Sequence, residues 1–175
     1  MQSQGRLYAF DVSEKRLKNL NPRLKRSGLS NVHPQLIASE NDIKVKRLAG
    51  KIDRVLVDAP CSGLGTLRRN PDLKWRQSPQ SIDELAVKQE KILSASASLL
   101  KPGGRLVYAT CSVLGQENQA VVEQFLADHS SFEKISAKHE LAENHIALDS
   151  DEYLKLCPHL HDTDAFFAAI MQRRA

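Results

Sequence analysis

Residues 52–63, Ile-Asp-Arg-Val-Leu-Val-Asp-Ala-Pro-Cys-Ser-Gly (IDRVLVDAPCSG), decide the fold. The segment from Ile52 to Val57 is rich in β-branched and apolar residues, as expected of a strand whose sheet is covered on both faces. A carboxylate, Asp58, and a thiol, Cys61, follow at its carboxyl end, which is where doubly wound sheets bind their ligands. The segment therefore predicts an α/β fold with reactive groups at the end of this strand.

Strands and helices alternate on both sides of this segment. Further strands are expected over 6–11, 32–37, 105–110, 132–135 and 165–171, and helices over 13–26, from 81 to the Pro-Gly-Gly at 102–104, and over 116–128. Residues 58–79 form a long connection, and 139–156 have no steady period and are expected to be irregular. Such alternation is typical of a doubly wound sheet with helices on both faces, here in one domain over 1–175.

Single residues set several of these boundaries. Pro22 predicts a kink or break in the first helix, and Pro34 predicts that the second strand lies at a sheet edge. Ser81 and Glu84 predict a capping box at the start of the long helix. The apolar stripe of that helix is expected to run as far as Leu100.

Composition excludes several classes of protein. The chain has 175 residues, of which 41% are hydrophobic, as in ordinary globular domains. No apolar run reaches the roughly 20 residues that span a bilayer, and the polar stretch Met1 to Arg6 lacks a secretory signal, so a cytoplasmic location is the default expectation. Three cysteines without a CxxC pair argue against a zinc knuckle and against a disulfide framework.

The formal net charge is +4, which permits a nucleic-acid partner without requiring one. Basic residues cluster at 15–26 and 44–51, where solvated helix faces are the simpler explanation. A third cluster surrounds the only tryptophan in the long connection, and its members are Arg68, Arg69, Lys74 and Arg76.

Three predicted strands end in acidic or reactive groups: Asp11, the run from Asp58 to Cys61, and Cys111 in Thr-Cys-Ser. Because parallel strands end at one rim of a sheet, we expect Cys61 and Cys111 to face one pocket, where helix N-termini and main-chain amides stabilise a thiolate. Cys157 is interpreted as a small buried hydrophobe. Asp11 suits the vicinal hydroxyls of a ribose, or it caps the following helix, and the pattern leaves both open.

Four segments carry a family resemblance: 9–17 (AFDVSEKRL), 58–75 (DAPCSGLGTLRRNPDLKW), 100–118 (LKPGGRLVYATCSVLGQEN) and 161–167 (HDTDAFF). They resemble the Sun, or Fmu, family of RNA cytosine-5 methyltransferases from near residue 5 to the end. The pair DAPCSG and TCS is the specific part, because the DNA enzymes use only the cysteine of the earlier motif. The resemblance implies a Rossmann-like class I methyltransferase sheet and S-adenosylmethionine as cofactor.

The resemblance also implies roles for individual residues. Cys111 attacks C6 of the cytosine, so that C5 can take the methyl group. Cys61 assists removal of the C5 proton and release of the product, and Asp58 contacts the base near N3 while bordering the cofactor site. Asp11 matches the acid that binds the cofactor ribose, and Asp42 matches the acid near the adenine, with a surface loop position as the alternative for Asp42.

The long connection is the candidate RNA contact. Arg68, Arg69 and Lys74 are placed to bind phosphates, and Trp75 is placed to stack on a base. The alternative is that Trp75 anchors the loop to the core. Ala165 stands where the family usually has glycine, and we expect mild strain in that turn.

The family's glycine-containing cofactor loop and the first strand that precedes it have no counterpart here, since the matching part would precede Gln2. Two hypotheses follow. In the first, the chain is the catalytic part of an enzyme that methylates RNA, with ribosomal RNA the expected substrate, and an upstream segment or a partner supplies the loop. In the second, the chain is an inactive remnant or an RNA-binding module. A thiol redox protein and a DNA methyltransferase fit the motifs less well.

Overall fold

The computed structural model describes residues 4–175, so Met1 to Ser3 of the polar N-terminal stretch lie outside the described residues. The chain forms two compact units, Met1–Arg47 and Leu48–Ala175. The single domain expected over residues 1–175 therefore stays a prediction, and each unit is described by itself.

The first unit is a two-stranded parallel sheet with two helices. Its elements are β1 (Leu7–Asp11), α1 (Glu14–Ser27), β2 (Val32–Leu36) and α2 (Ile43–Lys46). Ser13 caps α1, because its side chain accepts a hydrogen bond from the Arg16 amide, and Gly28 ends the helix in the left-handed conformation. Pro22 lies inside α1 without ending it. Among the described residues of this unit, Val45 is the buried hydrophobic one, so the core of the unit is thin.

The second unit contains the larger sheet. Its elements are β3 (Ile52–Asp58), η1 (Leu64–Thr66), α3 (Leu73–Arg76), α4 (Pro79–Ala97), β4 (Leu100–Thr110), η2 (Gly115–Glu117), α5 (Gln119–Asp128), β5 (Phe132–Ile135), α6 (Ala137–Glu143), β6 (Leu154–Leu156), α7 (Pro158–His161) and β7 (Phe166–Arg173). The strand order is β3-β4-β7-β5, with β6 also paired to β7. β3 and β4 are parallel, whereas β7 runs antiparallel to its neighbours, so the sheet is mixed.

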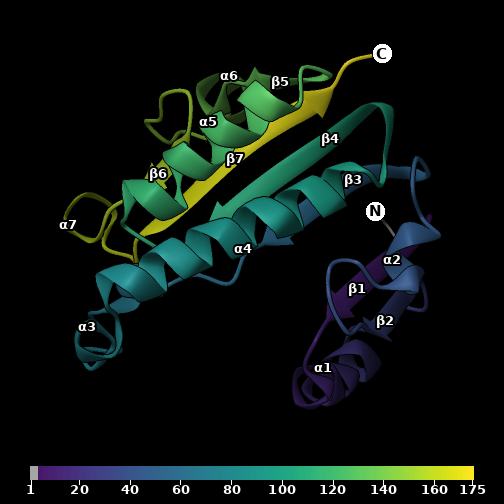
Figure 1. Ribbon diagram of the computed structural model, residues 1–175, viewed down its shortest axis with the longest axis horizontal. Helices are drawn as coiled ribbons and strands as arrows, with labels where there is room; N and C mark the ends of the chain where they lie inside the picture. The colour runs from purple at the N-terminus through teal and green to yellow at the C-terminus, as the bar shows by residue number, and fades with distance from the viewer. Residues whose placement is uncertain (1–3) are drawn as a thin grey trace. The chain divides into compact units, whose positions relative to one another are not determined.

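The core lies on the face of this sheet that α4 and α5 cover (Figure 1). Tyr108 and Phe167 from neighbouring strands meet edge to face there, beside the fully buried Leu93 of α4. Side chains alternate along a strand, so Arg105 lies on the opposite face, where it pairs with Glu140 of α6 at 2.7 Å. Helices therefore contribute to both faces of the sheet, as the sequence predicts.

The start and end of α4 differ from the prediction. The helix begins at Pro79, and its capping box joins Ser78 to Ser81 instead of Ser81 to Glu84. Proline favours the first helical position because its φ is already helical and its missing N–H is not needed there. At the other end α4 stops at Ala97, and Leu100 belongs to β4, where it pairs with Ile52. The tertiary pairing of strands thus overrides the continued apolar stripe.

The sequence predicts that residues 139–156 are irregular, and this prediction is wrong for the first and last residues of the segment. α6 extends into it, and β6 is formed by pairing of Leu154–Leu156 with β7. A strand of three residues has too short a pattern to be recognised without its partner.

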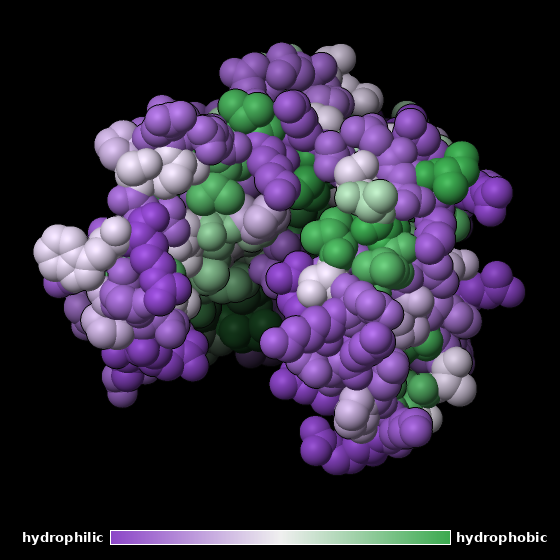
Figure 2. Space-filling view, turned by 60° about the horizontal axis from the view of Figure 1, so that its bottom comes forward, coloured by the Kyte–Doolittle hydropathy of each residue, from purple (hydrophilic) through white to green (hydrophobic). Residues whose placement is uncertain are grey.

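Among residues 4–175, no helix is both long and apolar enough to cross a membrane. Figure 2 shows a largely hydrophilic face with hydrophobic groups scattered over it.

Candidate active site

The second unit brings the two predicted reactive thiols together. β3 and β4 are parallel neighbours with Asp58 opposite Ala109, so the loops that follow them start at the same edge of the sheet. The Sγ atoms of Cys61 and Cys111 lie 3.3 Å apart, within hydrogen-bond distance for sulfur, and both side chains are partly buried. One thiol can therefore donate its proton to the sulfur of the other.

The environment divides the roles of these thiols. The hydrogen bond from Cys61 lowers the pKa of Cys111 to about 7, although burial and the charges of Asp58 and Glu117 act in the opposite direction. The same hydrogen bond, together with burial, raises the pKa of Cys61. Near neutral pH a substantial fraction of Cys111 is therefore the nucleophilic thiolate, while Cys61 keeps its proton.

Asp58 is exposed at the carboxyl end of β3. Its charge raises the pKa of Cys111, which means that the carboxylate acts on the thiol across the rim of the sheet. The three residues expected to carry chemistry, Cys111, Cys61 and Asp58, thus lie at one edge of one sheet.

Gly65 joins the two loops at close range. Its amide donates to the carbonyl of Cys111 at 2.8 Å, and its carbonyl accepts from the amide of Ala165 at 2.9 Å. A β-carbon at this position would lie 2.6 Å from the Cys111 oxygen, so only glycine allows this approach. Among the described residues, the non-glycine residues with left-handed backbone are His145 and Asp162. Ala165 is not one of them, so its own backbone does not require glycine, whereas Asp162 in the same turn has a positive φ of 49°.

Sequence reasoning missed a buried polar cluster beneath the thiols. Glu117 is fully buried and accepts hydrogen bonds from Ser62 and Ser112, the residues that follow the two cysteines. Gln89 of α4 is also fully buried and donates to Glu117 at 3.0 Å. The burial of Gln89 could have been predicted from the sequence, because this residue falls seven residues after Ile82 on the apolar stripe of α4. No periodic pattern distinguishes Glu117.

The two acids expected to bind the cofactor lie in the first unit. Both carboxylate oxygens of Asp11 are engaged by Arg16, at 2.7 and 2.6 Å, and this interaction lowers the pKa of Asp11. Asp11 is not the helix cap, because Ser13 has that role. Asp42 accepts hydrogen bonds from the amides of Lys44 and Ala38, which lower its pKa and make it the cap of α2.

The long connection between β3 and α4 contains both paired and exposed basic residues. Arg68 and Arg69 form ion pairs with Asp162 and Asp164, so these arginines tie the loop to the segment before β7. The side chain of Trp75 is 80% exposed, and the alternative that it anchors the loop to the core is therefore wrong. Nζ of Lys74 lies 4.8 Å from the centroid of the Trp75 ring.

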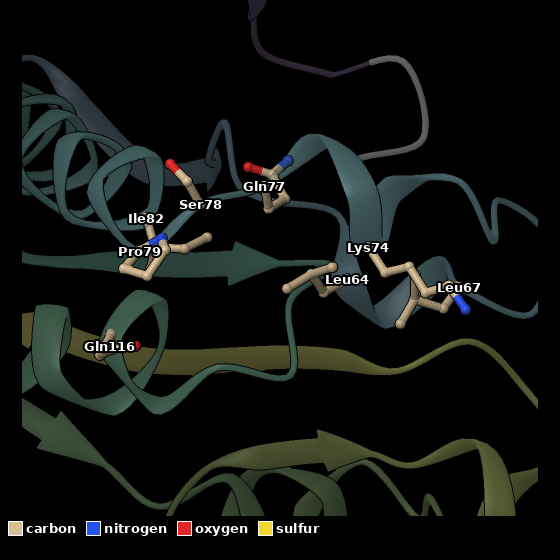
Figure 3. A pocket seen from close by; sticks show the side chains of 8 residues that line it. All are labelled: Leu64, Leu67, Lys74, Gln77, Ser78, Pro79, Ile82 and Gln116. Carbon is tan, nitrogen blue, oxygen red and sulfur yellow. The ribbon is translucent and has the colours of Figure 1, made fainter.

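An open pocket lies beside the Cys61 loop (Figure 3). It measures about 550 Å³ and is lined by Leu64, Leu67, Lys74, Gln77, Ser78, Pro79, Ile82 and Gln116. Nε2 of the Gln77 side chain donates to the backbone carbonyl of Ser62 at 3.1 Å, which links the pocket wall to the loop that holds the first thiol. Cys157 precedes α7 as its N-cap residue and is only partly buried, which is less than expected for a small hydrophobe of the core.

The fold is that of Rossmann-like methyltransferases. Over 99% of its length, the chain superposes on 38% of the crystal structure of PH0851, with a TM-score of 0.88 and 34% identity. It also matches 43% of NSun6 from Pyrococcus horikoshii, solved with SFG, an S-adenosylmethionine analogue, with a TM-score of 0.80 and 25% identity.

The chain belongs to the family described as 16S rRNA methyltransferase RsmB/F, whose model matches residues 1–172. It is 39% identical to the probable ribosomal RNA small subunit methyltransferase B of Synechocystis sp., over 99% of this chain and 39% of that protein. The family resemblance predicted from the motifs is confirmed. The chain spans about two-fifths of the length of the curated relatives that it matches.

Proposed function

We propose that this chain carries the reactive thiols of an S-adenosylmethionine-dependent RNA methyltransferase that acts on C5 of cytosine. The observation that carries the proposal is the pair of sulfur atoms 3.3 Å apart at the ends of two adjacent parallel strands. Family membership supports methyl transfer to ribosomal RNA, and the two cysteine motifs support the choice of carbon. Such an enzyme modifies ribosomal RNA in the cytoplasm.

Cys111 is the proposed nucleophile. Its pKa of about 7 provides a thiolate near neutral pH, and this thiolate adds to C6 of the cytosine to form a carbon–sulfur bond. The electron pair of the C5–C6 bond becomes available at C5, which takes the methyl group. N3 of the adduct takes a proton from solvent, and Asp58, at the same edge, stabilises the protonated N3 through its negative charge.

Cys61 is the proposed group that completes the reaction. In the free site, the hydrogen bond to Cys111 keeps its proton in place. Once the sulfur of Cys111 is bonded to carbon, that sulfur is neutral, and the largest cause of the raised pKa of Cys61 disappears. Cys61 then releases its proton to solvent, and its thiolate accepts the C5 proton. The C5–C6 double bond re-forms, Cys111 leaves as a thiolate, and N3 returns its proton to solvent.

S-adenosylmethionine would supply the methyl group from its sulfonium centre, and the neutral thioether S-adenosylhomocysteine would be the leaving group. Asp11 fits the vicinal hydroxyls of its ribose, because a carboxylate accepts two hydrogen bonds and the exposed Arg16 can turn away. Asp42 is proposed to lie near the adenine while it caps α2. A glycine loop for the methionine end is proposed to come from an upstream segment or a partner.

RNA is proposed to contact the connection between β3 and α4. Lys74 and the exposed Trp75 supply a charge for a phosphate and a ring for base stacking. Arg68 and Arg69 contribute to the positive field while they hold the loop in place. The target cytosine has to leave its stack to reach Cys111.

The test is methyl transfer to small-subunit ribosomal RNA by a protein extended upstream, with 5-methylcytosine located by bisulfite sequencing. Cys111→Ala should abolish the product, and transfer that survives this change would sink the assignment of the nucleophile. Cys61→Ala should accumulate a covalent protein–RNA adduct, visible on a denaturing gel. Cys157→Ala is the matched control and should behave as the unmodified protein.

Calorimetric titration with S-adenosylmethionine separates the enzyme from an RNA-binding module. We expect saturable binding by the extended protein. The RNA-binding module would be favoured if the extended protein bound RNA, lost this binding on Trp75→Ala, and showed neither cofactor binding nor methyl transfer. This outcome would overturn the proposed enzyme.

A further inference from the structure

The carboxylate of Glu117 is fully buried in the second unit, beneath the two reactive thiols. Its Oε1 accepts from the amide of Ser62 at 2.8 Å and from Nε2 of Gln89 at 3.0 Å. Its Oε2 accepts from the hydroxyls of Ser62 and Ser112. A buried carboxylate is tolerated when its oxygens are satisfied in this way, and here all four partners are donors.

The other hydrogen bonds of the two serine hydroxyls agree with donation to Glu117. The hydroxyl oxygen of Ser112 accepts from the amide of Leu114 at 3.1 Å, and that of Ser62 accepts weakly from the amide of Leu64 at 3.4 Å. The two hydroxyl oxygens also lie 3.2 Å apart, where either could donate to the other. Their contacts with Oε2 of Glu117 are shorter, which favours donation from both hydroxyls to the carboxylate. The cluster suits an acceptor-only group at its centre, and a side-chain amide there would face donors with a donor of its own.

Gln89 links the cluster to Pro60, the residue that precedes Cys61 in the chain. Its Nε2 donates both to Glu117 and to the carbonyl of Pro60 at 2.9 Å. Its Oε1 is buried and has no partner among the described residues. Burying an amide oxygen without a partner costs free energy. The two hydrogen bonds from Nε2 to Glu117 and to Pro60 offset this cost, so they, and not packing alone, explain why Gln89 is buried here.

We propose that Glu117, oriented by Gln89, is a positioning residue that ties the Cys61 loop to the Cys111 loop and so holds the two sulfur atoms in hydrogen-bond contact. Ser62 follows Cys61 and Ser112 follows Cys111, so one carboxylate bridges the immediate neighbours of both thiols. This inference deepens the proposed function and rests on it for the role of the thiols.

A positioning role and a purely electrostatic role of Glu117 predict opposite shifts in the pKa of Cys111. The groups that act on its thiol are Cys61, Asp58 and Glu117. As a nearby negative charge, Glu117 raises the pKa of Cys111, so its neutralisation alone would lower that pKa. As a tether, it maintains the hydrogen bond from Cys61, so its removal should raise the pKa of Cys111. The sign of the shift therefore distinguishes the two roles.

The experiment is Glu117→Gln in the 175-residue chain, with iodoacetamide alkylation of each cysteine followed by peptide mass spectrometry across pH. We expect the pKa of Cys111 to rise by about one unit, which slows its alkylation at pH 7 about fivefold. An unchanged or lowered pKa would overturn the proposal. Glu123→Gln, on the exposed side of α5, is the matched control and should leave the profile unchanged.

Ser112→Ala keeps the charge of Glu117 and removes one tether, so it decides the question even when Glu117→Gln does not fold. We expect slower alkylation of Cys111 at pH 7 in a chain whose circular dichroism is unchanged. Alkylation at the original rate would contradict the tether. The assay uses neither RNA nor cofactor, so its outcome is independent of whether methyl transfer is observed.

Discussion

The proton between Cys61 and Cys111 decides which sulfur is reactive. We predict that Cys61→Ala, which removes the donor, returns the pKa of Cys111 from about 7 toward the ordinary thiol value of about 8.5. Because the thiolate reacts and the thiol does not, alkylation of Cys111 in the unmodified chain should rise through pH 7. In the variant this rise should move to higher pH. Cys157→Ala is the control, and a profile unaffected by loss of Cys61 would count against the hydrogen bond.

Gly65 is the point where the Cys61 loop approaches the residue Cys111. We predict that Gly65→Ala lowers the free energy of unfolding by about 1–3 kcal/mol, because the added methyl group overlaps the carbonyl oxygens of Cys111 and Ala165. Urea unfolding followed by circular dichroism measures this. At Gly115 a β-carbon would have its nearest neighbour at 3.9 Å, so Gly115→Ala should change stability by less than about 0.5 kcal/mol. Equal effects of the two changes would refute the steric argument.

The helix α4 carries Gln89 to the thiols, so its first turn bears on the site. We predict that Ser78→Ala lowers the free energy of unfolding by about 1 kcal/mol, since the Ser78 hydroxyl caps the helix. Glu84→Ala should cost less than about 0.5 kcal/mol, because Glu84 lies on the exposed face and takes no part in the cap. Urea denaturation of both variants is the measurement. The opposite order would instead support the capping box that the sequence pattern suggests.

The two units of the chain differ in their cores. Apart from Val45, the buried hydrophobic residues of the described chain lie in the second unit, as do both reactive thiols and Glu117. We predict that a fragment of residues 48–175 unfolds cooperatively in urea and keeps the alkylation profile of Cys111. The matching fragment of residues 1–47 should show no cooperative transition, because it buries too little apolar surface. A 48–175 fragment without a folded circular dichroism spectrum would show that its core depends on the rest of the chain.

Local patterns in the sequence were sufficient for the alternating strands and helices, for Asp58, Cys61 and Cys111 at strand ends, and for the family. Strand periodicity, turn residues and motif spacing involve neighbours in the chain, so one sequence contains them in full. The same patterns misplaced the cap of α4, because Ser78 and Ser81 both precede the helical stripe and the two registers are equally plausible locally.

Contacts between distant segments were decided only by the tertiary structure. Glu117 and Ser62 are 55 positions apart, and a carboxylate is usually exposed, so its burial between two serines depends on β3 and β4 lying side by side. The exposure of Trp75, the pairing of Arg69 with Asp164 and the formation of β6 depend on the same long-range packing. The identity of the reactive residues is thus local information, whereas the arrangement that makes one of them a thiolate comes from the fold.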